Sequence, residues 1–463
     1  MTDAQQTQPV FPHSPFVPFD PGVLHYDMTW CLGGDAEAWE YTGWQDETMS
    51  WKTTAYIHGH LNPSPTVRLK GPDALEFLSS VCVNSFATFR VGASRHAIMT
   101  DEAGRVTAHG MLLRLADDEF ISYWLSPYLE FRLSQRPDLD VETEVLTGQV
   151  FLFQIGGPKA LEILEDATQE NLHDVAFLRH RPTTVAGREV RILRIGMAGG
   201  LAYELHGRLE DALPVYNAVL AAGADHGIRR LGVQAYMCNH TEAGFPQGYY
   251  HFPLAWGVSE DLQKYFAGIG FPPVGVSLIL RGSAGDDLDR RHRSPYELGW
   301  GHMVKFDHDF VGREALEREA AADATRMVTL VWNPEDIAEV FLSQFRPGEA
   351  HPYMNMPNHY MYEPGTAPVQ TLWADKVLVD GEDVGTSSGR CYTNWSREML
   401  SLATIKKEHA TEGTEVVVLW GDPGTNQKEI RATVARFPYL IDPVRNEKVD
   451  VSAIPCKYPA RDS

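Results

Sequence analysis

Two segments of the chain share one order of apolar and polar positions. In residues 65–83 an alternating run, PTVRL, precedes Lys-Gly-Pro-Asp and then an apolar pattern with helical spacing. Residues 150–167 repeat this order with VFLFQI, Gly-Gly-Pro and ALEILEDA. Alternation predicts a half-buried strand, and apolar residues three and four positions apart predict an amphipathic helix. The repeat therefore predicts two related α+β units, with Asp73 placed to cap the first helix.

Other segments extend this pattern. Residues 96–126 predict an antiparallel meander, because three alternating runs are separated by Asp-Glu-Ala-Gly and Asp-Asp turns. Residues 193–207 predict a strand pair, whereas residues 209–227 and 309–323 predict amphipathic helices. Residues 228–300 show no clear periodicity and are rich in aromatic residues, Gly and Pro. Such composition is typical of functional surfaces.

The last third of the chain has a different pattern. From about residue 325 short alternating runs, such as RMVTLVW and TEVVVLWG, are separated by Gly-containing turns, which predicts a small all-β barrel. We therefore expect an α+β fold of three domains. The first α+β domain is expected over residues 1–60 and 145–230, and the second, interwoven with it, over residues 61–144 and 231–310. The C-terminal β-barrel domain is expected over residues 311–463.

Composition and charge limit the classes of binding partner that we expect. The chain has 463 residues, 43% of them hydrophobic, and a net charge of -22 from 62 acidic and 40 basic residues. An acidic surface repels nucleic acid and anionic lipid, so we expect neither as a partner. The N-terminal stretch MTDAQQTQPV lacks the apolar run of a signal peptide, and no segment is apolar enough to span a membrane. Five widely spaced cysteines without a CxxC pair indicate a reduced, cytoplasmic protein without a zinc site. We expect it to be a monomer or a homodimer.

Several phrases resemble the family of the glycine-cleavage T-protein, an aminomethyltransferase. They are VRLKGPDALEFL, GRVTAHGMLLRLADDEF, GMAGGLAYELHG, GVQAYMCNHTEAGFP, PYELGWGHMVKFDHDFVGREAL and VLVDGEDVGTSSGRCY, in this order between about residues 50 and 440. The similarity is greatest to the tetrahydrofolate-dependent aromatic O-demethylases of the vanillate/3-O-methylgallate or syringate type. This resemblance implies two interwoven α+β domains around a central hole, a C-terminal β-barrel, and tetrahydrofolate as the cofactor within the hole.

Glu204 is a lone carboxylate inside the alternating run LAYELHG. The resemblance makes it the residue that binds the pterin, whose ring N–H and exocyclic NH2 are parallel donors that one carboxylate accepts together. The alternative is a surface or ion-paired Glu. Trp256 is expected to stack on the cofactor or to pack in the core, and Glu297 to contact the cofactor. Trp300 is expected to pack between the domains.

Demethylation of an aryl ether leaves a phenolate unless the leaving oxygen is protonated. A Tyr is a suitable proton donor, because its pKa of about 10 is close to that of a phenol. Tyr249 and Tyr250 occupy the place where the resemblance implies an active-site Tyr. Arg90 or Arg114 is expected to hold an acid group of the substrate.

Histidines supply further candidates. His60 and His109 are alternative proton donors, and His58, His240 and His251 are expected to contact the substrate. His58 and His60 alternate on one strand face, but the spacing indicates no third ligand, so no metal site is expected.

The chain also departs from the family pattern. Thr107-Ala108-His109 stands where aminomethyltransferases carry a catalytic Asp, and His240 stands where they carry Arg. In residues 58–64, HGHLNPS, Gly59 replaces an Asp, and Pro63 and Ser64 replace a His-Met pair. These changes disfavour glycine-cleavage chemistry.

Three functions follow from these residues. The first is a tetrahydrofolate-dependent O-demethylase that transfers a methyl group from a small lignin-derived methoxyaromatic. The second is a folate-independent lyase that cleaves a C–C bond of a phenolic lignin dimer and releases formaldehyde. The third is a folate-binding protein without catalysis.

Overall fold

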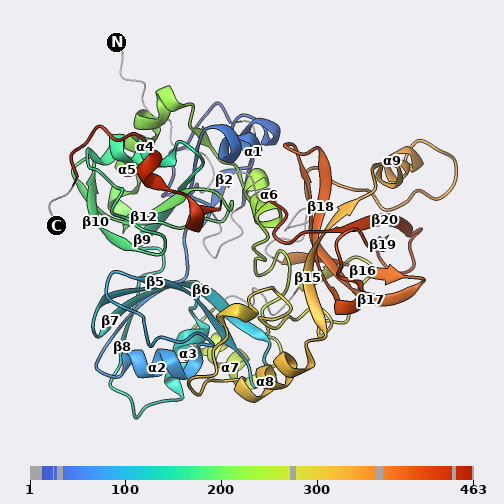
Figure 1. Cartoon of the computed structure of the whole chain (residues 1–463), viewed down its shortest axis with the longest axis horizontal. Helices are drawn as coiled ribbons and strands as arrows, with labels where there is room; N and C mark the ends of the chain where they lie inside the picture. The colour runs from blue at the N-terminus through green and yellow to red at the C-terminus, as the bar shows by residue number, and fades with distance from the viewer. Residues whose placement is uncertain are drawn as a thin grey trace.

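A computed structural model describes residues 13–23, 25–28, 35–271, 278–359, 369–440 and 445–460. Three large sheets organise this part of the chain, two with flanking helices and one closed on itself (Figure 1). A small pair of strands, β1 (Tyr26–Met28) and β2 (Ala36–Ala38), precedes them. No helix within the described ranges is both long and apolar enough to cross a membrane.

The first sheet has the order β10-β11-β12-β9-β3-β13. These strands are β10 (His180–Val185), β11 (Arg188–Leu193), β12 (Ala202–Arg208), β9 (Val150–Gly156), β3 (Tyr56–His58) and β13 (Arg229–Arg230). Two helices, α4 (Ala160–Thr168) and α5 (Ala212–Gly223), share one apolar core with β9 and β12. Tyr203 of β12 is buried in this core.

The second sheet is antiparallel and has the order β5-β6-β7-β4-β8. Its strands are β5 (Ser94–Thr100), β6 (Val106–Ala116), β7 (Glu119–Tyr123), β4 (Thr66–Lys70) and β8 (Glu142–Val145). The helices α2 (Ala74–Val81), α3 (Tyr128–Ser134), α7 (Glu260–Gly268) and α8 (Arg313–Ala322) contribute to its core. The predicted meander and both strand–turn–helix units are present.

The cap predicted for α2 is wrong. Asp73 occupies the N-cap position, but its side chain makes no hydrogen bond to the helix. Its carboxylate instead accepts the backbone N–H of Asp140 at 2.8 Å. A donor from a segment distant in sequence therefore takes the place of the helix N–H.

The third sheet closes into a ring. It contains β14 (Leu278–Arg281), β16 (Gln370–Val379), β17 (Glu382–Thr393), β18 (Glu398–Lys406), β15 (Thr325–Trp332), β20 (Lys428–Ala435) and β19 (Glu415–Trp420) in this order. Strand β16 also pairs with β19, so six strands form the closed barrel that the sequence predicted. Helix α9 (Pro334–Ser343) follows β15.

Two segments cross the expected domain ranges. Strand β14 comes from the range 231–310 but pairs with β16 of the C-terminal sheet. The C-terminal segment with the turns η5 (Asn446–Lys448) and η6 (Val451–Ala453) returns to the core of the first sheet (Figure 1). The domain boundaries themselves stay a prediction.

The region without periodicity contains a helix, α6 (Val233–Ala243), which contacts α1 (Trp44–Thr53) and strand β17 (Figure 1). All of its residues are buried. A helix covered on every side has no polar face, so it shows no amphipathic pattern in the sequence. This helix carries Tyr236 and His240 into the candidate site.

Candidate active site

A cavity of about 1100 Å³ opens where the two α+β sheets, α6 and the C-terminal segment meet. Strands β5, β6, β7 and β12 supply part of its wall, and the loop over residues 244–256 supplies much of the rest. Ligand sites in proteins commonly have volumes of roughly 300–1,000 Å³. The cavity is therefore large enough for a cofactor and a substrate together.

Glu204 lies on the cavity wall and is 2% exposed. Its Oε2 is 3.0 Å from His206 Nε2, and its Oε1 accepts a hydrogen bond of 3.4 Å from the side chain of Gln154 on β9. Tyr56 donates in turn to Gln154, which holds the amide in place. A carboxylate accepts about four hydrogen bonds, so Glu204 keeps capacity for two more. This burial excludes a surface Glu, whereas the contact with His206 fits the other alternative, an ion-paired Glu.

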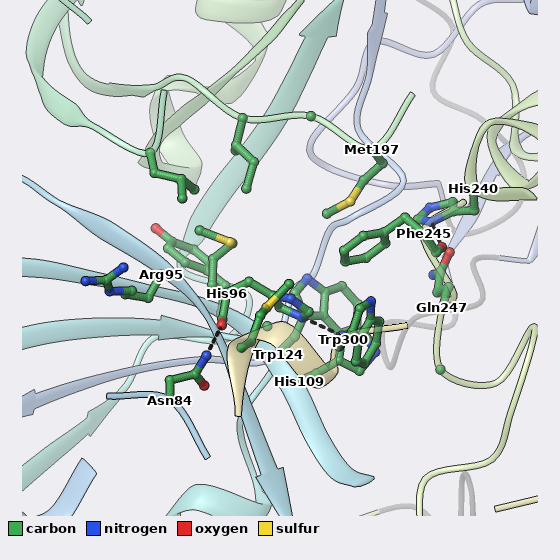
Figure 2. Close-up of a pocket in the computed structure, with 18 of the residues that line it drawn as sticks. Asn84, Arg95, His96, His109, Trp124, Met197, His240, Phe245, Gln247 and Trp300 are labelled. Carbon is green, nitrogen blue, oxygen red and sulfur yellow. Dashed lines mark hydrogen bonds between the residues drawn. The ribbon is translucent and has the colours of Figure 1, made fainter. Parts of the chain in front are cut away.

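Two half-buried histidines, His96 and His109, meet in the lining of the cavity. His96 Nε2 lies 3.2 Å from His109 Nδ1, and Figure 2 shows both rings beside Trp300. The His109 and Trp300 ring centroids are 4.8 Å apart. Burial lowers the pKa of His109 from 6.5 to about 4 and holds that of His96 well below its usual value. At neutral pH both imidazoles are uncharged. His109 can therefore accept or donate a hydrogen bond, but it is not an imidazolium that could protonate a leaving group.

This burial predicts an acid sensitivity. The folded-state pKa of His109 lies below the unfolded value, so its contribution to stability is complete above pH 6.5 and is lost as the pH falls toward 4. At pH 5 the loss is roughly 2 kcal/mol. The free energy of unfolding in urea is measured at pH 7.5 and at pH 5. Its decrease between the two pH values should be about 2 kcal/mol smaller in His109→Gln than in the wild type. The exposed His302→Gln variant serves as the control, and equal losses in all three proteins would contradict the assignment.

Tyr249 and Trp256 line the cavity from the loop after α6. Their ring centroids are 5.7 Å apart, and the Trp256 indole donates to the carbonyl of Thr107 at 2.6 Å. The Tyr249 hydroxyl is buried and has no hydrogen-bond partner within the described residues. Tyr249 also has a φ of 64°, a left-handed conformation that is costly for a residue other than Gly. Strained residues of this kind gather at functional sites.

Tyr250 lies outside the cavity lining, although it is adjacent to Tyr249 in the sequence. Its hydroxyl donates to the carbonyl of Arg390 at 3.4 Å, and its ring stacks on His359 with centroids 4.6 Å apart. Burial raises the pKa of Tyr249 and of Tyr250 well above 10. Of the two predicted donors, only Tyr249 is thus placed to meet a bound ligand.

His60 and His58 pack beside the cavity rather than in its lining. His60 uses both ring nitrogens, because Nδ1 bonds the Glu37 carboxylate and Nε2 lies 2.6 Å from the Leu231 carbonyl. The His58 ring lies 5.7 Å from that of His60 and 4.6 Å from that of Tyr236. These contacts indicate a structural role for His60 in place of the expected proton donation.

His251 and Glu297 are likewise engaged outside the lining. His251 accepts the backbone N–H of Gln247 at 3.0 Å and lies 3.1 Å from the hydroxyl of Thr241. The Glu297 carboxylate accepts the backbone N–H of Ser294 at 3.0 Å. Both side chains therefore stabilise local turns.

The two arginines expected to hold a substrate acid do not line the cavity either. Arg90 is exposed, and Arg114 donates to the backbone carbonyls of Phe89, Ala116 and Asp117. Arg95 lines the cavity instead.

His240 reaches the cavity from α6, as expected. Its Nδ1 lies 3.3 Å from the Phe245 carbonyl, and burial lowers its pKa to about 3. Figure 2 shows it facing Met197 and Phe245, with Gln247 nearby. Sequence reasoning missed several residues that line the cavity. They are His96, Tyr236, Phe245 and Gln247, and Trp300, which was expected to pack between the domains, also lines the cavity.

Comparisons with known proteins agree with this architecture. The family model of the GCVT N-terminal domain matches residues 31–249. A sesamin methylene transferase from Sinomonas sp. strain No.22 is 47% identical over 427 residues, which cover 90% of this chain and 93% of that protein. A syringate O-demethylase from Sphingobium sp. strain SYK-6 is 33% identical over 423 residues, 86% of this chain and 89% of that protein.

A solved structure shows the same fold. The glycine cleavage system aminomethyltransferase T from Bartonella henselae superposes with a TM-score of 0.60, covering 90% of this chain and 95% of that chain, at 15% identity. This likeness establishes the three-part α+β architecture with its C-terminal barrel. Together with the two long sequence matches, it shows that the chain belongs to the GCVT aminomethyltransferase family, whose members are transferases that act on one-carbon units.

Proposed function

We propose that this chain transfers a one-carbon unit from an aromatic ether to tetrahydrofolate. The observation that carries the proposal is the position of the buried Glu204 carboxylate on the wall of a large cavity that also contains Tyr249 and His109. One side chain can orient a cofactor, and the others can act on a leaving oxygen.

The residues present fit tetrahydrofolate. Glu204 has two acceptor positions left for the ring N–H and exocyclic NH2 of a pterin, and Gln154 and His206 hold the carboxylate in position. When bound there, the cofactor supplies the amine nitrogen that receives the one-carbon unit. Glu204 would fix which face of the pterin meets the substrate.

The aromatic residues of the cavity lining suit an aromatic ether. Phe245, Trp256 and Trp300 offer ring surfaces against which the substrate ring can stack. When the carbon–oxygen bond of the ether breaks, the Tyr249 hydroxyl donates a hydrogen bond to the leaving phenolate oxygen. His109, which is uncharged, accepts or donates a hydrogen bond on the same side of the cavity.

Two classes of donor fit this chemistry. A lignin-derived methoxyaromatic would give up a methyl group, as the similarity to a syringate O-demethylase suggests. A methylenedioxy ring would give up its bridging methylene group, as the similarity to a sesamin methylene transferase suggests. The 47% identity with the latter, against 33% with the former, favours the methylenedioxy donor, and the cavity volume leaves room for a substrate of two rings.

The experiment that tests the proposal is a turnover assay with and without tetrahydrofolate. Syringate, vanillate and sesamin are incubated with the protein, and methyl- and methylene-tetrahydrofolate are separated by mass spectrometry. A folate-bound one-carbon product supports the proposal and identifies the donor class. Formaldehyde released without folate would point to the lyase, and folate binding without any product would point to a non-catalytic folate-binding protein.

A further inference from the structure

Three different metal-binding side chains meet outside the cavity, where the C-terminal segment passes α4. Glu165 lies on α4, His173 in the loop that follows, and Cys456 near the end of the described chain. One ligand atom from each lies within 4.8 Å of the other two. Figure 1 shows the C-terminal segment, in red, beside α4. Residues separated by almost 300 positions thus bring a carboxylate, an imidazole and a thiol together.

The cluster contains an imidazole nitrogen without a hydrogen-bond partner in the described chain. His173 Nε2 is buried and makes no hydrogen bond within the described chain, although it stands 3.5 Å from Glu165 Oε1. Glu165 is 2% exposed, and its Oε1 accepts the Leu172 N–H at 2.9 Å. Burial, followed by the hydrogen bond to Glu165, raises the pKa of the Cys456 thiol. An orphaned imidazole nitrogen therefore faces a carboxylate and a thiol.

We propose that Glu165, His173 and Cys456 form a binding site for a divalent cation of the zinc type. Thiolate, imidazole and carboxylate are the protein ligands of zinc, and three of them leave one position for water. Mg²⁺ and Ca²⁺ prefer oxygen ligands alone, so the sulfur and nitrogen select against them. The Cys456 thiol loses its proton to solvent as the sulfur–metal bond forms.

The charges around the cluster are compatible with a cation. Lys457, the neighbouring positive group, is held 2.6 Å from the Asp166 carboxylate. The same carboxylate accepts the Tyr458 hydroxyl at 3.1 Å and lies 3.7 Å from His226. Asp166 therefore neutralises the lysine, and the Glu165 carboxylate supplies negative charge at the site.

The site would fasten the segment that completes the cavity wall. Residues 445–447 line the cavity, and the Arg194 guanidinium holds the backbone carbonyls of Asn446 and Val449 at 2.6 and 2.9 Å. Val451 and Ile454 then pack against the core of the first sheet. A metal bond at Cys456 would tie the far end of this segment to α4.

Cobalt titration of the untagged full-length protein tests the proposal, because a cobalt–thiolate bond absorbs in the near ultraviolet. We expect one saturable site per chain with this absorption, and competition by zinc. Cys456→Ser should abolish the thiolate band, and His173→Gln should weaken cobalt binding by roughly 100-fold. The matched control is His226→Gln, a neighbouring histidine outside the cluster, which should bind cobalt as the wild type does.

A second readout separates metal binding from misfolding. Cys456 is the cysteine within the described chain that is not buried, so its reaction with a thiol reagent reports on this site. Zinc should slow that reaction in the wild type and raise the midpoint of thermal unfolding, with no rise in Cys456→Ser. The proposal is overturned if the wild type shows no saturable cobalt–thiolate band, or if the band persists in Cys456→Ser. Neither result depends on folate chemistry, so failure of the metal-site proposal would leave the proposed function unchanged.

Discussion

Glu204→Gln is expected to weaken tetrahydrofolate binding by about 10- to 100-fold, because hydrogen bonds to a charged group contribute about 1.5–3 kcal/mol. The amide keeps the shape of the side chain but replaces one acceptor oxygen with a donor that faces the donors of the pterin. Isothermal titration with tetrahydrofolate measures the change directly. The stability of the variant, followed by thermal unfolding, shows whether the loss is local.

Glu297→Gln is the matched control for this prediction. Glu297 was the other carboxylate expected to contact the cofactor, but its side chain accepts the Ser294 N–H outside the cavity lining. We expect its variant to bind tetrahydrofolate as the wild type does. If Glu297→Gln loses affinity while Glu204→Gln retains it, the cofactor assignment is wrong.

Tyr249→Phe is expected to lower the rate of one-carbon transfer by about 10²- to 10⁴-fold, the usual contribution of a positioned proton donor. Tyr249 lines the cavity, and its buried hydroxyl has no hydrogen-bond partner among the described residues, so its removal breaks no hydrogen bond within them. Single-turnover measurements with the active donor and tetrahydrofolate report the rate of the chemical step. Substrate affinity should change far less than the rate.

Tyr250→Phe removes the same hydroxyl one residue away. That hydroxyl donates to the Arg390 carbonyl, so its loss should affect stability more than turnover. If Tyr249→Phe and Tyr250→Phe lose turnover to the same extent, the loop as a whole, and not the Tyr249 hydroxyl, supports the reaction. Restored turnover of Tyr249→Phe with substrates that carry a more acidic leaving phenol would further support proton donation.

Local periodicity correctly predicted most elements of the fold. The strand–turn–helix units, the meander and the closed C-terminal barrel each have a repeat of two or about 3.6 residues that short-range geometry imposes. Helix α6 was missed because its residues are buried on all sides, which removes the polar face that would have shown its period. Because α6 was not predicted, Tyr236, which reaches the cavity from that helix, was not predicted as a site residue either.

The candidate site was predicted less well than the fold. Glu204, Tyr249, Trp256, His109 and His240 line the cavity. His60, by contrast, is occupied by Glu37 and by the carbonyl of Leu231, the latter 171 positions along the chain. Sequence alone does not reveal such a partner, because no local pattern records which distant segment will supply it.

The sequence by itself determined that Glu204 and Tyr203 face opposite sides of one strand, because successive side chains of a strand alternate. Only the tertiary structure decided that one side is an apolar core and the other a cavity. It also decided which of two adjacent tyrosines faces that cavity and which packs against the C-terminal ring. The physical reason is that backbone sterics set the period of an element, whereas contacts between distant segments set what each face meets.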